Sequence, residues 1–230
     1  MKKKIFLSFI LVFVLAIAVF SFTGKGKERR GENNIIIQNM VFTMPYESLS
    51  PLEKISLLKM REEEKLAGDI YLALYETWGI PVFNNISDSE QKHMDAVKSL
   101  IIKYGLNDSV INDKRGEFTN PELKKLYEKL VEQGKSSIAE ALKVGAIIED
   151  LDIYDIDEAI LKSDNTDIVF VFGNLRKGSE NHMRAFIYQL NNYGISYTPQ
   201  YISQEEFNKI KEGNHNSGQG NGRGRGRRKW

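Results

Sequence analysis

The sequence predicts an all-α protein whose four long helices form an antiparallel bundle. Apolar residues recur at helical spacing in four long stretches, and helix-start or helix-stop residues bound each stretch. No stretch alternates apolar and polar residues convincingly enough to predict a β-strand. The chain has no cysteine, which excludes disulfides, thiolate metal sites and cysteine nucleophiles.

The expected bundle domain spans residues 48–212. Ser50 as N-cap, Pro51 at the first helical position and Glu53 as capping-box partner start its first helix. We expect the third long helix to break near residue 153 and to resume after Asp155. We expect the four long helices at residues 51–78, 84–104, 137–153 and 166–193. Two short helices are expected at 121–134, as an insertion, and at 204–211.

The two ends of the chain differ in composition from its middle. Residues 1–23 join a basic start to a long apolar run, which predicts a signal peptide or, if it is retained, an N-terminal membrane anchor. Either one predicts an exported protein, secreted or held at the outer face of the cytoplasmic membrane. Residues 24–47 lack a sustained period and are expected to be a linker. Residues 213–230 are rich in glycine and arginine and are expected to be a disordered tail.

The second helix carries Glu90 and His93, which are three residues apart and therefore adjacent on one helix face. Phe83 and Ile86 continue the apolar stripe of that face. A buried carboxylate needs a cationic partner, and a metal ion is one such partner. The alternative is that Glu90 only completes a capping box with Ser87, which would start the helix later.

On the first helix, Glu64 lies in an apolar stripe that includes Tyr71. The alternative is that residues 61–65 form a solvated run of charges. Glu62 fits that alternative, and Glu63 is ambiguous. A glutamate on the apolar face, as Glu64 is, favours a ligand over a surface charge.

The third helix places Glu149 and Asp152 together on an apolar stripe, with Asp150 turned outward. The alternative is a polar patch at the end of a helix. If this pair points inward, three helices direct carboxylates to the middle of the bundle.

The fourth helix places His182 on its apolar face. A lone histidine there is more often a hydrogen-bonded core residue, but here the other helices supply carboxylates. The residue three positions earlier is Ser179 instead of a glutamate, and Glu180 points elsewhere on a regular helix. This helix therefore contributes one strong ligand.

These residues resemble the ferritin-like superfamily. The resemblance rests on Glu64 with Ala67 and Tyr71, on Glu90-x-x-His93 and on Glu149-x-x-Asp152. Residues 66–71, 89–94 and 178–182 are closer still to a bacterial and archaeal branch of ferritin-like domains found in secreted proteins of unknown function. The resemblance covers about residues 48–200. It implies a dinuclear metal centre with the ligands Glu64, Glu90, His93, Glu149, Asp152 and His182.

The function we predict from this ligand set is oxidation of ferrous iron by oxygen or peroxide. Carboxylates and neutral imidazoles suit both oxidation states of iron, and manganese is the alternative metal. Without cysteine the chain cannot build a cysteine-bound iron module, so ferrous iron itself or an external donor would supply electrons. A homodimer is compatible with the sequence.

A metal-free helical interaction module is the alternative function. Residues 31–212 carry 20 basic and 30 acidic residues, whereas both ends of the chain are basic. On this view the Arg/Gly tail at residues 222–230 binds an anionic cell-surface polymer or membrane headgroups. Such tails also bind nucleic acid, which we do not expect as the partner of an exported protein. A tail that only solubilises the protein is the third interpretation.

Overall fold

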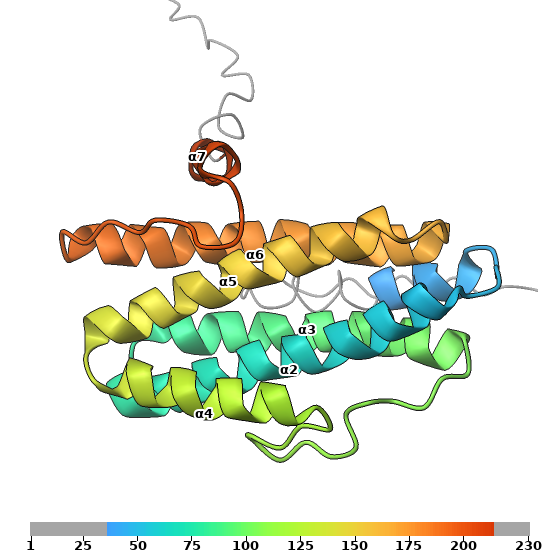
Figure 1. The fold of residues 1–230 in the computed structure, drawn as a ribbon, viewed down its shortest axis with the longest axis horizontal. Coiled ribbons are helices and arrows are strands. Elements are labelled where there is room, and N and C mark those ends of the chain that lie inside the picture. Colours follow the sequence, from blue (N-terminus) through green and yellow to red (C-terminus); the bar gives the residue numbers. More distant parts are fainter. Residues whose placement is uncertain (1–35, 214–230) are drawn as a thin grey trace, which may run out of the picture.

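The structure, a computed structural model, describes residues 36–213 and shows an all-α protein, which confirms the predicted fold class (Figure 1). No β-strand occurs within this part of the chain. A helical segment at residues 36–43 precedes the labelled helices. These are α2 (Pro51–Trp78), α3 (Pro81–Lys103), α4 (Pro121–Lys135), α5 (Ile138–Leu161), α6 (Thr166–Asn192) and α7 (Gln204–Glu212).

The four long helices α2, α3, α5 and α6 pack side by side as a bundle. The most extensive contacts join α2 to α3 and α5 to α6, while α3 also contacts α6 and α2 also contacts α5. The short helix α4 packs against α2 and α5. In Figure 1, α7 is seen end-on beyond α6 and thus lies across the bundle. Each long helix therefore has one side turned to the other three.

Local sequence explains the helix boundaries well. Ser50 and Glu53 form the expected capping box, in which Oγ of Ser50 accepts from the Glu53 amide at 3.2 Å. Gly79 ends α2 in a left-handed conformation with φ 65°, which glycine adopts without strain. Helix α3 starts at Pro81, before Ser87, so Glu90 lies inside the helix instead of capping it.

The predicted break in the third long helix is wrong. Helix α5 runs without interruption from Ile138 to Leu161. Ile153, Ile156 and Ala159 are all buried at a spacing of three residues, so one continuous helix keeps an apolar face in the core. That packing keeps the helix continuous through the acidic stretch at residues 149–158.

The prediction of a solvated charge at Glu62 is also wrong. Its carboxylate is buried and accepts from the backbone amides of Thr119 at 2.5 Å and Asn120 at 3.2 Å. Lys65 is buried as well and donates to the carbonyl of Lys114 at 2.8 Å. These charged residues hold the loop between α3 and α4 on the surface of α2.

Asp150 points away from the metal-binding candidates, as expected, yet it is fully buried. Its carboxylate accepts from the amides of Tyr201 at 3.2 Å and Ile202 at 3.0 Å, and from the hydroxyl of Tyr197 at 2.8 Å. The segment that follows α6 therefore folds back over α5 and covers this acid.

The part of the predicted linker that the structure describes carries one buried residue. Val41, in the helical segment 36–43, is fully buried against the bundle. Residues 1–35 and 214–230, including the expected signal or anchor and nearly all of the expected tail, lie outside the described residues. Of the helices that the structure describes, none is both long and apolar enough to cross a membrane.

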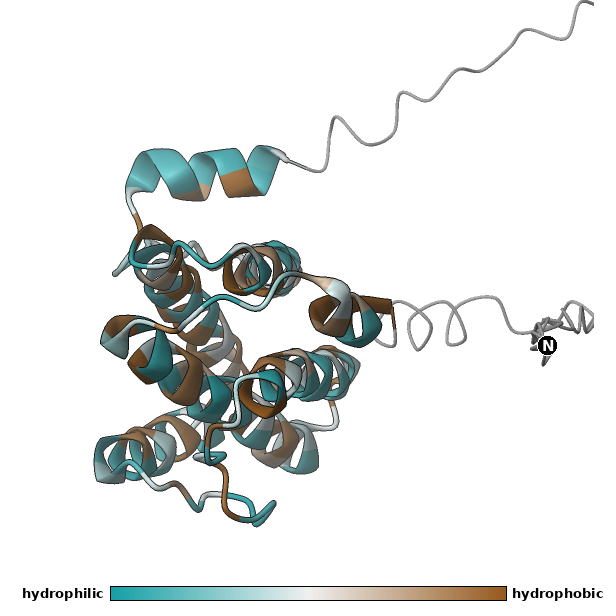
Figure 2. Ribbon diagram, turned by 90° about the vertical axis from the view of Figure 1, so that its right-hand side faces the viewer, coloured by the Kyte–Doolittle hydropathy of each residue, from teal (hydrophilic) through white to brown (hydrophobic). Residues whose placement is uncertain are grey.

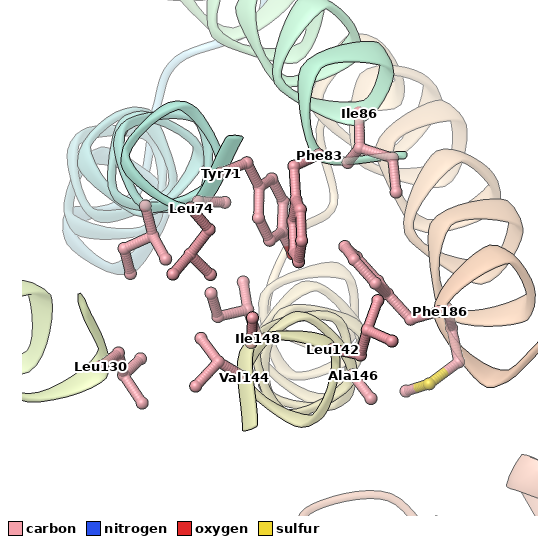
Figure 3. Packing of buried hydrophobic residues seen from close by; sticks show 14 of the residues in the cluster. Tyr71, Leu74, Phe83, Ile86, Leu130, Leu142, Val144, Ala146, Ile148 and Phe186 are labelled. Atoms are coloured by element: carbon pink, nitrogen blue, oxygen red, sulfur yellow. The ribbon is translucent and has the colours of Figure 1, made fainter. Parts of the chain in front are cut away.

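Two clusters of buried apolar side chains fill the bundle. The first contains Tyr71, Phe83 and Phe186, whose rings face one another with centroids 5.3 to 6.4 Å apart (Figure 3). The second contains Leu57, Leu100 and Phe172, among others. Figure 2 shows that the long helices carry both hydrophobic and hydrophilic residues, whereas α7 is largely hydrophilic. Along α2, α3 and α6 the polar candidates fall between the residues of the two clusters, whereas on α5 they lie next to Ile148 and Ile153 of the first cluster.

Candidate metal centre

Five of the six candidate ligands meet in the middle of the bundle. They come from all four long helices, with Glu90 and His93 both on α3. They form two groups, in each of which one nitrogen or oxygen atom per residue lies within 4.8 Å of the others. Glu90 belongs to both groups. The groups are Glu64, Glu90 and His93, and Glu90, Glu149 and His182.

In the first group the imidazole of His93 lies between two carboxylates. Its Nδ1 is 3.0 Å from Oε2 of Glu64 and 2.7 Å from Oε2 of Glu90. The two carboxylates have 2 % exposed side chains or less, and His93 is 12 % exposed. One edge of the imidazole thus faces the carboxylates while the ring stays close to the surface.

The second group has the same composition and is buried more deeply. Nδ1 of His182 lies 2.9 Å from Oε1 of Glu90 and 3.5 Å from Oε2 of Glu149. The rings of His93 and His182 are stacked, with centroids 5.5 Å apart. The two oxygens of Glu90 therefore face two different imidazole nitrogens.

Several of these atoms approach one another closely without forming hydrogen bonds. Both oxygens of Glu90, Oε1 of Glu64 and Nδ1 of His182 are buried and have no hydrogen-bond partner within residues 36–213. Buried polar atoms without partners are uncommon and costly in folded proteins. Cations bound in the two groups would give these atoms partners, and carboxylate with imidazole is a donor set that suits several transition metals.

The sixth candidate, Asp152, lies next to the two groups without belonging to either. Its Oδ2 accepts a short hydrogen bond from the hydroxyl of Ser179, which is fully buried on α6. Burial raises the pKa of Asp152 well above its usual range, and the nearby carboxylates of Glu64 and Glu149 raise it further. Ser179 stands three residues before His182, where a glutamate would complete a Glu-x-x-His pair. Its hydroxyl instead pairs with a carboxylate from α5.

The remaining acids of the sequence analysis do not enter the two groups. Glu180 forms an ion pair with Arg176 one turn earlier on α6 and so points away from the centre, as expected for a regular helix. Glu63, which was ambiguous from sequence, pairs with Lys59 at 3.1 Å. Burial raises the pKa of Glu63 to about 8, although Lys59 opposes this shift.

Tyr71 supports the second group in a way that the sequence did not indicate. Its hydroxyl donates to Oε1 of Glu149 at 2.5 Å, and the ring is fully buried in the first apolar cluster. This bond leaves the other oxygen of Glu149 turned to His182. The apolar stripe located Tyr71 in the core, but only the packing of α2 against α5 brings its hydroxyl to the carboxylate.

The charge balance of the cluster favours protons or metal cations. Burial lowers the pKa of His182, but the carboxylates of Glu90 and Glu149 outweigh burial and raise it to about 10. Burial raises the pKa of Glu64 to about 8, with His93 acting in the opposite direction. In a metal-free cluster, imidazolium protons thus partly neutralise the carboxylates. Metal ions would displace these protons.

One family model covers all six candidate ligands. The pattern of a family described as "uncharacterized protein domain (DUF2202)" matches residues 53–214, which include all six candidates. The chain is 57 % identical over 170 residues to the uncharacterized protein MJ0754 of Methanocaldococcus jannaschii, covering 74 % of this chain and 92 % of that protein. It is also similar to the crystal structure of hypothetical protein MJ0754 from Methanococcus jannaschii, with a TM-score of 0.73 at 57 % identity, covering 74 % of this chain and 97 % of that chain.

Proposed function

We propose that this chain, which belongs to the DUF2202 family, binds two metal ions in its carboxylate and histidine cluster and oxidises ferrous iron. The observation that carries the proposal is the position of Glu90. Its two oxygens lie 2.7 Å from Nδ1 of His93 and 2.9 Å from Nδ1 of His182, and neither oxygen has a hydrogen-bond partner among the described residues. A carboxylate so placed is suited to bridge two cations.

The donor set supports iron as the metal, with manganese as the alternative. Three carboxylates and two imidazoles tolerate both ferrous and ferric iron, and a fourth carboxylate, Asp152, is adjacent. Inward glutamates with a Glu-x-x-His pair are the ligands used by di-iron helical bundles. On this basis we propose that the domain is a ferritin-like one.

Each side chain of the cluster would have a separate role in holding the metal ions. Glu90 would offer a ligand to both ions, and Glu64 and Glu149 would each offer a ligand to one of them. Tyr71 would hold Glu149 in place through the hydrogen bond that its hydroxyl donates to Oε1 at 2.5 Å. The two apolar clusters exclude bulk water from both sides, which strengthens electrostatic interactions inside. Bound iron would supply one electron per ion to dioxygen or to hydrogen peroxide.

The absence of cysteine from the sequence limits the source of electrons for the proposed oxidation. The chain has no cysteine, so it lacks the ligands for a cysteine-bound iron module. Ferrous iron itself, or an external donor, is therefore the reductant. The basic and apolar sequence of residues 1–23 supports a site of action outside the cytoplasm.

The test compares ferrous iron oxidation by the parent protein, by His93→Ala and by buffer alone. Gln91→Ala is the matched control, because Gln91 is exposed on the same helix and its side chain donates a hydrogen bond to Asp95, which belongs to neither group of the centre. We expect the parent and the control to exceed the rate in buffer, and His93→Ala to lose the excess together with bound iron. Equal rates for His93→Ala and the parent would contradict the proposal.

A further inference from the structure

A row of carboxylates that the proposed centre does not use leads from the surface toward Asp152. Asp152, Asp155 and Glu158 are three residues apart and therefore share one face of α5. Glu63 of α2 lies opposite this row, since it shares the counter-ion Lys59 with Asp155. Side-chain exposure decreases inward, from 40 % at Glu158 to 17 % at Asp155 and 13 % at Glu63.

Two adjoining cavities follow this row between α2 and α5. The outer one has a volume of about 320 Å³ and is lined by Lys59, Glu63, Asp155 and Glu158, among others. The inner one, of about 50 Å³, is lined by Glu63, Asp152, Asp155 and apolar side chains of α2, α4 and α5. Glu63 and Asp155 line both cavities and so stand at the junction between them.

The junction has more negative than positive charge. Nζ of Lys59 lies 3.1 Å from Oε1 of Glu63 and 2.8 Å from Oδ1 of Asp155. One positive charge is therefore shared by two carboxylates. The other oxygen of Glu63, Oε2, is shielded from solvent and has no hydrogen-bond partner among residues 36–213. An unpaired buried carboxylate oxygen that lines a cavity is an unused ligand for a cation.

We propose that Glu63 and Asp155 form a loading site at which divalent cations bind before they pass Asp152 and reach the carboxylate and histidine cluster. A divalent ion would neutralise both carboxylates, whereas the ammonium of Lys59 neutralises one. The Lys59 side chain is 47 % exposed, so its ammonium can turn into solvent when a cation replaces it. This inference rests on the proposed metal-binding function.

The test measures how fast Co²⁺ enters the metal-free protein, by stopped-flow absorbance, and how many ions bind at equilibrium. Asp155→Asn should slow loading about tenfold or more, because a cleft that attracts cations raises their rate of association. Lys59→Met should speed loading, because it removes the competing ammonium. Both variants should bind as many ions in the cluster as the parent protein does.

The control variants make the same charge changes on α4, where Glu122 and Lys125 form an exposed ion pair at 2.8 Å. Glu122→Gln and Lys125→Met should leave the loading rate unchanged. Opposite changes in rate for the two test variants would support the loading site, since a folding defect would not accelerate loading. Unchanged rates in both, with full cobalt binding, would overturn the loading site alone. A parent protein that binds no cobalt would overturn the proposed centre and the loading site with it.

Discussion

The imidazole of His93 packs directly against the backbone of Gly178. A Cβ atom added at residue 178 would lie well within 3.0 Å of both Nε2 and Cε1 of His93, a separation that real Cβ atoms essentially never show. The ring is also stacked on that of His182. The His93 ring, which belongs to α3, therefore contacts two residues of α6, and its Nδ1 lies close to Glu64 and Glu90.

Gly178→Ala should therefore displace His93 and weaken metal binding at the first group. Displacing a ligand in this way should cost about 10- to 100-fold in affinity, as loss of a supporting contact to a metal ligand typically does. Isothermal titration with Co²⁺, together with the visible spectrum of the bound ion, would measure the change.

Gly173→Ala is the control, because Gly173 is on the same helix and an added Cβ there meets nothing within 4 Å. Alanine is the better helix former by roughly 0.5–1 kcal/mol, so this variant should be slightly more stable and bind metal like the parent. Identical binding by Gly178→Ala and Gly173→Ala would mean that Gly178 does not position His93.

Tyr71→Phe should remove the only hydroxyl that donates to Glu149 among the hydrogen bonds of the described residues. The buried carboxylate oxygen would lose its donor, and the free energy of unfolding should fall by about 1–3 kcal/mol. Urea unfolding measures this loss. Tyr188→Phe on the exposed side of α6 should change stability by less than about 0.5 kcal/mol. A Tyr71→Phe protein as stable as the control would show that this hydrogen bond contributes nothing.

Much of the fold and most of the cluster could be predicted from sequence, because both follow local rules. Helical spacing and caps located the long helices, and the inward faces identified Glu64, Glu90 and His182. The break expected in α5 and the solvated Glu62 were wrong because tertiary contacts override local charge. Glu62 finds its partners at Thr119 and Asn120, more than 50 residues away.

The supporting contacts of the centre could not be predicted, because they depend on how two helices pack. No spacing rule relates Gly178 to His93 or Ser179 to the carboxylate of Asp152. A glycine inside a long helix was the one available signal at Gly178, since glycine weakens a helix unless close packing requires it.

The metal-free protein should lose stability as the pH rises from about 6.5 to about 10. The ordinary pKa of histidine is 6.5. Burial lowers the pKa of His182, but the carboxylates of Glu90 and Glu149 outweigh burial and raise it in the folded protein to about 10. In that window the folded form holds a proton that the unfolded form releases. The stabilisation that this proton gives the folded form is complete below pH 6.5 and is lost as the pH approaches 10. For one proton, the free energy of unfolding falls by up to about 1.4 kcal/mol per pH unit.

Urea unfolding of the metal-free protein across this range would measure the slope. His182→Gln should have a shallower slope than the parent, because its folded form no longer holds this proton. Saturating metal should reverse the trend, since metal binding displaces protons and is favoured by high pH. A parent and a His182→Gln variant with the same slope would show that His182 is not protonated in the metal-free cluster.

Asp150→Ala should release the segment that follows α6. Three backbone amides and the Tyr197 hydroxyl of this segment donate to the buried carboxylate of Asp150. Without it, limited proteolysis should cleave between residues 195 and 203 faster than in the parent. Asp113→Ala, in the exposed loop before α4, serves as control. Equal cleavage in both variants would argue that apolar packing alone holds the segment.

The central claim is that Glu90 bridges two metal ions, and anomalous diffraction from a crystal loaded with ferrous iron would test it most directly. The expected map has two peaks at the iron absorption edge, one contacting Glu64 and His93 and the other contacting Glu149 and His182, with Glu90 between them. A map with no peak at these residues, or with peaks that Glu90 does not contact, would contradict the account.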